Sequence, residues 1–538
     1  MKLSARLALC LAYAGAACAA TRNFDVVVYG GTAGGVIAAV SAARQGLKTA
    51  LIEPTAHLGG MVSGGLGWTD YGKKEVIGGY ALEFYWRVGM HYQMARYGND
   101  VAWLHEPHVA ETIFRDMLRG AGVTVFDRQR LREKTGVRKN GPAIAAITTE
   151  DGTDFTASVF IDSGYEGDLM AQAGVSYTFG REGASQYGES LAGVRDKTPF
   201  HQFLVDVSPK DARGKLLPEV SAAHLDPPGS ADKRVQAYNF RMCFSEAPEN
   251  RRAFPRPAGY DPARYALLAR LIAAVQKKDG RVPPIGSFLK IDRIPNGKAD
   301  VNNNGPFSTD YLGGSWTYPD ASYREREAIW QAHRDYIAGL LYFLANDAQV
   351  PDPLRAELNH WGLCRDEFQD NDNWPYQLYI REARRMVGEY VVVQKDLQTE
   401  LTKPDPIGMG SYNSDSHNIQ RIVDADGFVR NEGDMQVPVK PYQIPYRVML
   451  PKRAEARNLL VTAAFSASHV AYSSVRMEPQ YMIISQAAGV AAKLAISGNK
   501  PVQEIDTAEL VRILKQQGAV LEYQPNAQLP VLQIIRRQ

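Results

Sequence analysis

The chain has 538 residues, of which 45% are hydrophobic and 22% are charged, and its formal net charge is +2. A chain of this length exceeds what one hydrophobic core usually supports, so we expect two or more lobes. Because neither sign of charge forms a long run, the composition gives no electrostatic footprint for DNA, RNA or an anionic membrane, and it favours small-molecule chemistry.

The first twenty residues have the pattern of an export signal. Lys2 and Arg6 precede a short apolar stretch, and small residues follow up to Ala19 and Ala20. This predicts a signal peptide over residues 1–20 and a secreted or periplasmic protein. The apolar stretch is shorter than the roughly 20 residues that cross a bilayer, and we expect no membrane span in the rest of the chain.

A strand, turn, helix and strand follow. The sequence FDVVVYGG at 24–31 predicts a buried parallel strand, GVIAAVSAARQG at 35–46 a helix, and KTALIEP at 48–54 a second strand that ends in an acid. The turn GGTAGG with Glu53 is typical of dinucleotide binding: glycines approach the pyrophosphate, and the acid reaches the ribose. Thr32 replaces the usual middle glycine.

The remaining chain predicts three further parts. Short segments between 122 and 161 predict an antiparallel meander that returns to the main sheet. The stretch 196–400 is rich in Pro, Asn, Trp and Tyr, contains one strong helical segment at 324–347, and resembles an inserted lobe. The stretch 458–475 predicts a buried strand, and 478–498 a helix rich in small residues that packs closely on another helix.

We therefore predict an α/β fold in which the dinucleotide-binding part is interrupted by an α+β substrate lobe. The expected boundaries are 1–20 for the signal peptide, 21–195 and 401–500 for the two halves of the binding domain, 196–400 for the lobe and 501–538 for a C-terminal tail. The single N-terminal turn and the glycine pair at Gly59 and Gly60 favour FAD over NAD. Without a second such turn, we expect electrons to pass to oxygen, a quinone or a protein.

Metal chemistry is not expected. Once the signal peptide is removed, Cys243 and Cys364 remain, which allow one disulfide but not an iron–sulfur cluster. The segment Asp300–Tyr311 starts like a calcium loop, but it has Tyr311 where the bidentate glutamate is required. Its asparagines suit either tight turns or a hydroxyl-rich ligand such as a sugar.

At this point the sequence resembles a known family. The stretches GGTAGG, EPTAHLGGMVSGGLGWTD, CRDEFQDNDNWPYQLYIREARRMVGEY, DSHNIQR and SASHVAYSSVRMEPQYMIISQAAGVAA are similar to the FAD-dependent oxidoreductase family of the glutathione-reductase-like Rossmann fold. The resemblance implies FAD as the cofactor. It implies no substrate, and some relatives carry a xanthan lyase label.

The resemblance also implies positions for FAD. The residues expected at the ADP half are Gly30, Gly31, Thr32, Gly34, Gly35, Glu53, Val125 and, near the phosphates, Gly164. The residues expected near the flavin ring are Gly59, Gly60, Met61, Arg476, Met477, Glu478, Pro479 and Gln480.

Flavin-dependent dehydrogenation of an alcohol needs a base beside the ring, and a neutral histidine is the natural candidate. His469 and His417 are both candidates. Arg476 is expected to place a positive charge near the reduced flavin, and Tyr446 to hydrogen-bond substrate or flavin. We predict hydride transfer between flavin N5 and a small organic substrate such as a carbohydrate. A redox-neutral polysaccharide lyase and a non-catalytic flavin-binding protein remain the alternatives.

Overall fold

The computed structural model describes residues 20–527 and residue 529. All of the predicted signal peptide except Ala20 lies outside this range, as does the end of the predicted C-terminal tail. The sequence Thr21–Asn23 forms strand β1, directly after the expected cleavage site.

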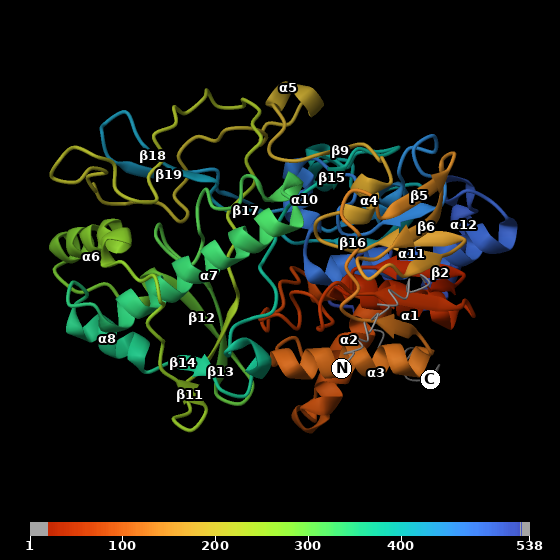
Figure 1. Ribbon diagram of the computed structural model, residues 1–538, viewed down its shortest axis with the longest axis horizontal. Coiled ribbons are helices and arrows are strands. Elements are labelled where there is room, and N and C mark those ends of the chain that lie inside the picture. The colour runs from red at the N-terminus through yellow and green to blue at the C-terminus, as the bar shows by residue number, and fades with distance from the viewer. Residues whose placement is uncertain (1–19, 528, 530–538) are drawn as a thin grey trace, which may run out of the picture.

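A five-stranded parallel sheet forms the core of one half of the molecule (Figure 1). Its strand order is β22-β8-β2-β3-β4, and every residue of the four strands other than β4 is buried, as continuous apolar runs in parallel sheets require. The strands are β22 (Leu459–Val461), β8 (Val159–Asp162), β2 (Val26–Tyr29), β3 (Thr49–Ile52) and β4 (Thr124–Phe126).

Two buried helices pack tightly on each other next to this sheet, α1 (Ala33–Arg44) and α11 (Glu478–Gly498). A Cβ added to Gly489 would lie 2.5 Å from the side chain of Ser41, so only a small residue fits there. The Ser41 hydroxyl donates to the carbonyl of Gln486 at 2.7 Å. The expected close packing of the small-residue helix is confirmed, and its partner is α1.

The predicted meander is smaller than the sequence indicates. Strands β5 (Val137–Asn140), β6 (Ala143–Thr148) and β7 (Asp154–Thr156) form it, and β1 adds to its edge in parallel with β7. The flanking segments VTVFD and SVFID pair instead with β3 and β2 of the parallel sheet.

The other half of the molecule is a mixed lobe built mostly from the predicted insertion (Figure 1). Its antiparallel sheet has the order β11-β14-β10-β13-β12, and the long helix α7 begins at a capping box between Ser322 and Glu325. The strands are β10 (Met242–Ser245), β11 (Arg251–Arg252), β12 (Leu289–Ile294), β13 (Lys298–Asn303) and β14 (Gly362–Cys364). The helices are α6 (Ala266–Asp279), α7 (Tyr323–Asn346) and α8 (Asp352–Asn359).

Later parts of the chain return to this lobe. The hairpin of β18 (Gln420–Val423) and β19 (Val429–Glu432) bonds to it through Arg421 and Asn431, whose side chains both donate to the carbonyl of Pro306. The hairpin therefore lies with the lobe, although it follows residue 400 in the sequence.

The stretch 458–475 is not one strand. Strand β22 ends at Val461, and Ser468 then caps a short helix, α10 (His469–Val475), by accepting the N–H of Ala471 at 3.1 Å. The sequence did not predict this cap, because a short apolar run has the same composition in a buried helix as in a buried strand.

Shorter elements connect these parts. The helices are α2 (Gly79–His91), α3 (Pro107–Ala121), α4 (Asp168–Gln172), α5 (Ala184–Tyr187), α9 (Gln394–Gln398) and α12 (Thr507–Gln516). The strands are β9 (Tyr177–Thr178), β15 (Arg385–Met386), β16 (Pro406–Gly410), β17 (Ser414–Ser416), β20 (Met435–Val437) and β21 (Tyr442–Pro445).

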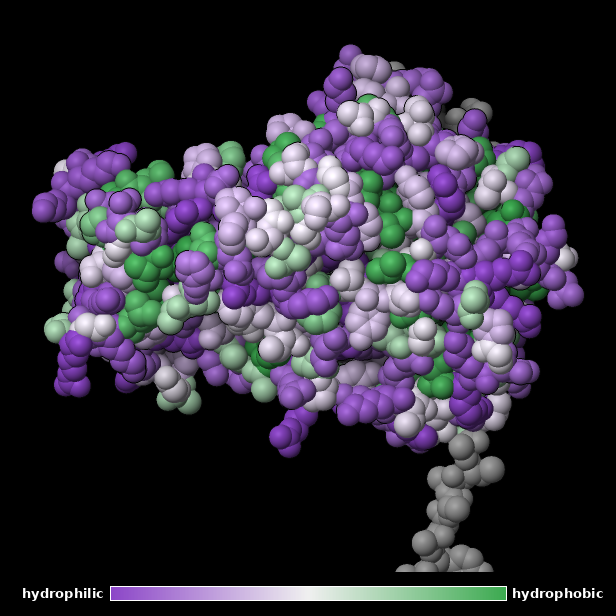
Figure 2. All heavy atoms as spheres, turned by 90° about the horizontal axis from the view of Figure 1, so that it is seen from above, coloured by the Kyte–Doolittle hydropathy of each residue, from purple (hydrophilic) through white to green (hydrophobic). Residues whose placement is uncertain are grey.

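Cys243 and Cys364 are buried free thiols on neighbouring strands, with their sulfur atoms 2.9 Å apart. Within residues 20–527, no helix is both long and apolar enough to cross a membrane. The face shown in Figure 2 is mostly hydrophilic, with small groups of hydrophobic side chains scattered over it.

Candidate functional site

The turn between β2 and α1 accepts only glycine at two positions. Gly30 has a φ of +95°, and a Cβ there would lie 2.6 Å from the main-chain nitrogen of Gly164. A Cβ on Gly35 would lie 1.8 Å from the carbonyl oxygen of Gly30. Gly30 therefore allows the tight turn, and Gly35 allows the helix to pack closely on the end of β2.

Thr32 fills the place of the missing middle glycine by capping α1. Its hydroxyl accepts the N–H of Gly35 at 3.0 Å and donates to the carbonyl of Ser163 at 2.9 Å. The side chain is thus used by the protein itself, as an N-cap threonine commonly is. Gly34 lies behind the turn, where a Cβ would be 2.9 Å from the hydroxyl of Ser485 on α11.

Glu53 ends β3 with its carboxylate directed back to the turn. One oxygen accepts the N–H of Gly31 at 2.7 Å, and the other accepts the N–H of Thr55 at 2.6 Å. Burial raises the pKa of Glu53, although these hydrogen bonds oppose the shift. A carboxylate held in this way beside the turn is placed to accept hydrogen bonds from ribose hydroxyls.

A cavity of about 490 Å³ opens on this turn. Gly30, Thr32, Glu53 and Gly164 line one side of it. Helix α7 and the segment 374–377 also line it, with aromatic side chains interspersed among charged and polar ones. The aromatic residues of these two segments are Tyr323, Trp330, Trp374 and Tyr376. Phe240 and Tyr318, from other segments, also line the cavity.

The start of α7 is fastened across the cavity to the segment that follows β4. The hydroxyl of Tyr323 donates to the carbonyl of Leu131 at 3.0 Å, and the guanidinium of Arg130 lies 4.5 Å from the centre of the Tyr323 ring. Arg130 also pairs with Glu327 on α7 at 2.8 Å. We call these contacts the α7 clasp.

The glycine pair after β3 meets the N-terminus of α11 through Tyr165. A Cβ on Gly60 would lie 2.4 Å from the Tyr165 hydroxyl, which accepts the N–H of Met61 at 2.9 Å and donates to Glu478 at 2.6 Å. Gly59 has a φ of +105°. The structure therefore brings together the two segments that were expected at the flavin ring.

Several buried polar atoms at this end of α11 have no hydrogen-bond partner among the described residues. They are the second carboxylate oxygen of Glu478, both amide atoms of Gln480 and Nε of Arg476. Pro479 lies in the first turn, preceded by the N-cap Met477. Because an unpaired buried polar group is costly, these atoms indicate a bound group that offers both donors and acceptors.

Arg476 links this end of α11 to His417. Its guanidinium donates to the carbonyl of Asp415 at 2.8 Å and to the hydroxyl of Tyr379 at 3.2 Å. The Asp415 carboxylate lies 3.9 Å from Nε2 of His417. Arg476 therefore forms its ion pair with Asp415, at 3.4 Å.

His417 is itself held by a buried carboxylate. Its Nδ1 lies 2.7 Å from Asp310, and the other oxygen of Asp310 pairs with Arg381 at 2.9 Å. Burial alone would raise the pKa of Asp310, but the charges of Arg381 and His417 lower it below its ordinary value. Asp310 is therefore ionised at neutral pH and orients the imidazole.

A family model for FAD dependent oxidoreductases matches residues 25–514 of this chain. The chain belongs to the FAD-dependent oxidoreductase family. FAD is its cofactor. Gly30, Thr32 and Glu53 on the cavity wall fit the ADP half of that molecule, and the unpaired polar atoms at the start of α11, which lie outside the cavity lining, fit the polar edge of its ring. Two-electron redox chemistry follows from FAD when it is bound.

Comparisons with individual proteins are more distant. Among solved structures, the chain is similar to a geranylgeranyl bacteriochlorophyll reductase-like protein from Thermoplasma acidophilum, at 12% identity and a TM-score of 0.37, over 93% of this chain and 85% of that one. It is also similar to an L-amino acid deaminase from Proteus vulgaris, at 15% identity and a TM-score of 0.20, over 27% and 54%. No curated protein matches the sequence.

The other candidate histidine of this FAD-dependent oxidoreductase, His469, lies in a buried ion network at the start of α10. Its Nδ1 is 2.8 Å from Glu382, its N–H donates to Glu182 at 2.8 Å, and Arg385 pairs with both acids. Burial, followed by the charge of Arg385, lowers the pKa of His469 to about 3. Neither His469 nor His417 is among the residues that line the cavity, so the two differ in their partners and not in their contact with it.

Two more predicted residues are placed away from the cavity wall. Tyr446 is buried, and its hydroxyl donates to the carbonyl of Val502 at 2.7 Å, which gives it a packing role. Val125 lies in β4, in register with Leu51 of β3. Neither residue is among those that line the cavity.

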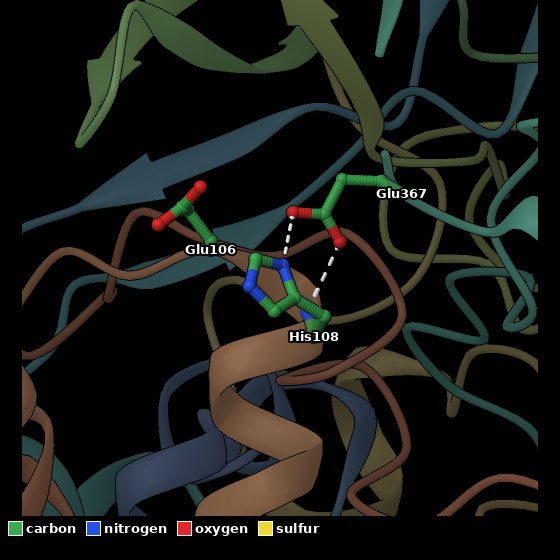
Figure 3. A group of neighbouring side chains, drawn as sticks. All are labelled: Glu106, His108 and Glu367. Atoms are coloured by element: carbon green, nitrogen blue, oxygen red, sulfur yellow. Dashed lines mark hydrogen bonds and ion pairs between the residues drawn. The ribbon is translucent and has the colours of Figure 1, made fainter. Parts of the chain in front are cut away.

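A cluster of Glu106, His108 and Glu367 has the spacing of a metal site (Figure 3). The carboxylate of Glu367 accepts both the N–H of His108 at 3.1 Å and its Nδ1 at 2.7 Å. The ammonium of Lys298 lies 2.7 Å from both Glu106 and Glu367. Since this buried lysine already supplies a positive charge between the acids, we assign the cluster as an ion network.

Sequence reasoning missed Tyr165 and Asp310 as site residues, and it missed α7 as a wall of the cavity. Tyr165 directly follows Gly164, which was expected near the phosphates, so it was close to a recognised position. Arg381 lies in the YIREARR stretch, where one of the three arginines was a candidate to face a substrate. No local pattern marks Asp310 as the partner of His417, because the two residues are 107 positions apart.

Proposed function

We propose that this FAD-dependent oxidoreductase oxidises a hydroxyl group of a neutral carbohydrate, with His417 as the base. When FAD is bound, its flavin N5 supplies the acceptor for the hydride. The observation that carries the proposal is the buried Asp310–His417 pair, which is joined through Asp415 to Arg476 at the end of α11.

The geometry gives His417 the properties of a base. In the neutral imidazole, a hydrogen bond from Nδ1 to the ionised Asp310 places the lone pair on Nε2, where it can take the proton of a substrate hydroxyl. His469 makes a similar contact with Glu382. However, Glu182 and Arg385 complete a buried ion network around it. We therefore assign the base to His417.

The charges around His417 support an uncharged substrate. Arg381 is paired with Asp310, and Arg476 with Asp415, so each positive charge already has a carboxylate. Burial, together with the negative charges of the nearby Asp415 and Asp310, raises the pKa of Asp434 to about 8. A carboxylate substrate finds no unpaired cation among these groups, whereas hydroxyl groups can bond to them.

We also propose that the fold is of the glutathione-reductase type and that the chain is exported. The parallel sheet with its meander and inserted lobe supports the first. The basic residues, the short apolar stretch and the small residues within residues 1–20 support the second. Determining the N-terminal sequence of the protein purified from its native host tests the export proposal: a chain that begins at Met1 contradicts it.

The test of the activity is anaerobic bleaching of the flavin absorbance by a panel of neutral sugars, sugar acids and simple alcohols. We expect at least one neutral sugar to bleach the flavin, and the matching sugar acid to do so at least tenfold less efficiently. Bleaching by the acids alone contradicts the substrate class. Formation of an unsaturated product with unchanged flavin absorbance supports the lyase alternative instead.

A further inference from the structure

A second pocket, of about 370 Å³, opens on the lobe near His417. Three separate parts of the chain line it: the segment 199–204, the segment 304–306 after β13, and Gln436 in β20. We call it the outer pocket. Phe200 and Leu204 on its rim are 43% and 68% exposed, although both are large and apolar.

His201, within the segment 199–204, has an unusual backbone conformation. Its φ is +46°, a left-handed value that costs free energy for a residue with a Cβ. Its carbonyl accepts the side-chain amides of Asn418 at 3.2 Å and Asn431 at 2.9 Å. Gln202 adds two hydrogen bonds to the main chain of Asn431. These hydrogen bonds therefore fix the main chain at His201.

The outer pocket is connected to the proposed base through His201. The rings of His201 and His417 are parallel to within 9°, and their centres are 6.3 Å apart. Nδ1 of His201 and Oδ1 of Asn418 are buried and have no hydrogen-bond partner among the described residues. Such atoms are rare in folded proteins and point to a ligand.

The lining of the outer pocket suits one kind of ligand. It contains the aromatic ring of Phe200, the amides of Asn304 and Gln436, and the imidazole of His201, and it contains no Asp, Glu, Lys or Arg. An aromatic ring stacks on the apolar face of a sugar, while amides and imidazole bond to its hydroxyls. The absence of charge in the lining favours an uncharged ligand.

We propose that the outer pocket binds the second sugar unit of a neutral saccharide whose first unit reaches His417. The inference rests on the proposed function, because it assumes that the reacting unit is a sugar. It gives the segment 199–204 a role in substrate selection: an oligosaccharide contacts both sites, and a monosaccharide contacts only the inner one.

The first test compares kcat/KM for flavin reduction by maltose, cellobiose and lactose with the values for glucose and galactose. We expect at least one disaccharide to be preferred about tenfold over its component sugars. Phe200→Ala should remove this preference and leave the monosaccharide value unchanged. Tyr97→Ala is the control, because Tyr97 is a 79% exposed aromatic residue that lines neither pocket.

A second readout separates the outer pocket from the redox chemistry. Saturation-transfer NMR of the same disaccharides on the oxidised, FAD-loaded protein should detect binding that is lost in Phe200→Ala and kept in Tyr97→Ala. If that binding is seen but no sugar bleaches the flavin, the outer pocket is supported and the proposed oxidation is contradicted. If the wild type neither binds nor prefers a disaccharide, or if Phe200→Ala weakens both sugar sizes equally, the outer pocket proposal is overturned.

Discussion

The glycine turn and the surroundings of His417 are built in opposite ways. The turn, its helix and Glu53 come from one continuous stretch of chain, and each part bonds to the next within it. The base is assembled from residues that lie far apart in sequence, with Asp310, Arg381 and Arg476 supplied by different elements. A local motif can therefore indicate FAD, whereas the partners that distinguish the proposed base His417 from His469 are recognised only once the chain is folded.

The largest effect is expected from breaking the continuous region. A valine side chain at position 35 would overlap the carbonyl oxygen of Gly30. Helix α1 must therefore move away from β2 in Gly35→Val. We expect a loss of at least about 3 kcal/mol in the free energy of unfolding, and colourless protein. Denaturant unfolding and flavin absorbance measure this.

Gly120→Ala is the matched control for Gly35→Val. Gly120 lies in helix α3, and a Cβ there meets nothing within 4 Å. We expect this variant to be at least as stable as the wild type and to stay yellow, because alanine favours a helix by about 0.5–1 kcal/mol. Equal stability of the two variants would show that the turn tolerates a side chain.

The next prediction compares the two histidines. His417→Gln should lower kcat for flavin reduction by about 10²- to 10⁴-fold with the FAD content unchanged, because it removes the base but not the cofactor contacts. His469→Gln should lower the melting temperature, because it disturbs a buried ion network, and leave kcat per bound flavin within a few-fold. The opposite pattern would transfer the catalytic role to His469.

A smaller effect concerns the pH dependence of stability. Burial raises the pKa of Glu478 from 4.5 to about 8. Between these values the folded state holds a proton that the unfolded state has lost, so the free energy of unfolding falls as pH rises and levels off above about pH 8. The slope from this one group is at most about 1.4 kcal/mol per pH unit.

Glu478→Gln should remove that slope. Its stability relative to the wild type should therefore increase from pH 5 to pH 8, as measured by denaturant unfolding of the FAD-free proteins. Asp434, whose pKa is also about 8, and Asp162, whose pKa is about 7, act in the same direction in both proteins, so the difference isolates Glu478. A constant difference across this range contradicts the assignment.

The sequence predicts the parallel sheet, α1, α7 and α11, because their periodicity and end signals are local. It misplaces the strand and cap around Ser468, where a buried helix and a buried strand have the same apolar composition. It also leaves both His469 and His417 as candidates, because one is a single histidine in an apolar segment and the other a single histidine in a polar loop. Only the packing shows that Glu182 and Arg385 enclose one of them, whereas His201 and the outer pocket adjoin the other.

The α7 clasp affects how readily a bound nucleotide can be exchanged. Tyr323 and Arg130 join the start of α7 to the segment after β4 at the cavity beside the glycine turn. Exchange of the nucleotide requires the hydrogen bond to Leu131 and the ion pair with Glu327 to separate together. The enzyme should therefore acquire its colour while the two halves are still coming together during synthesis, and keep it through dialysis and many rounds of turnover.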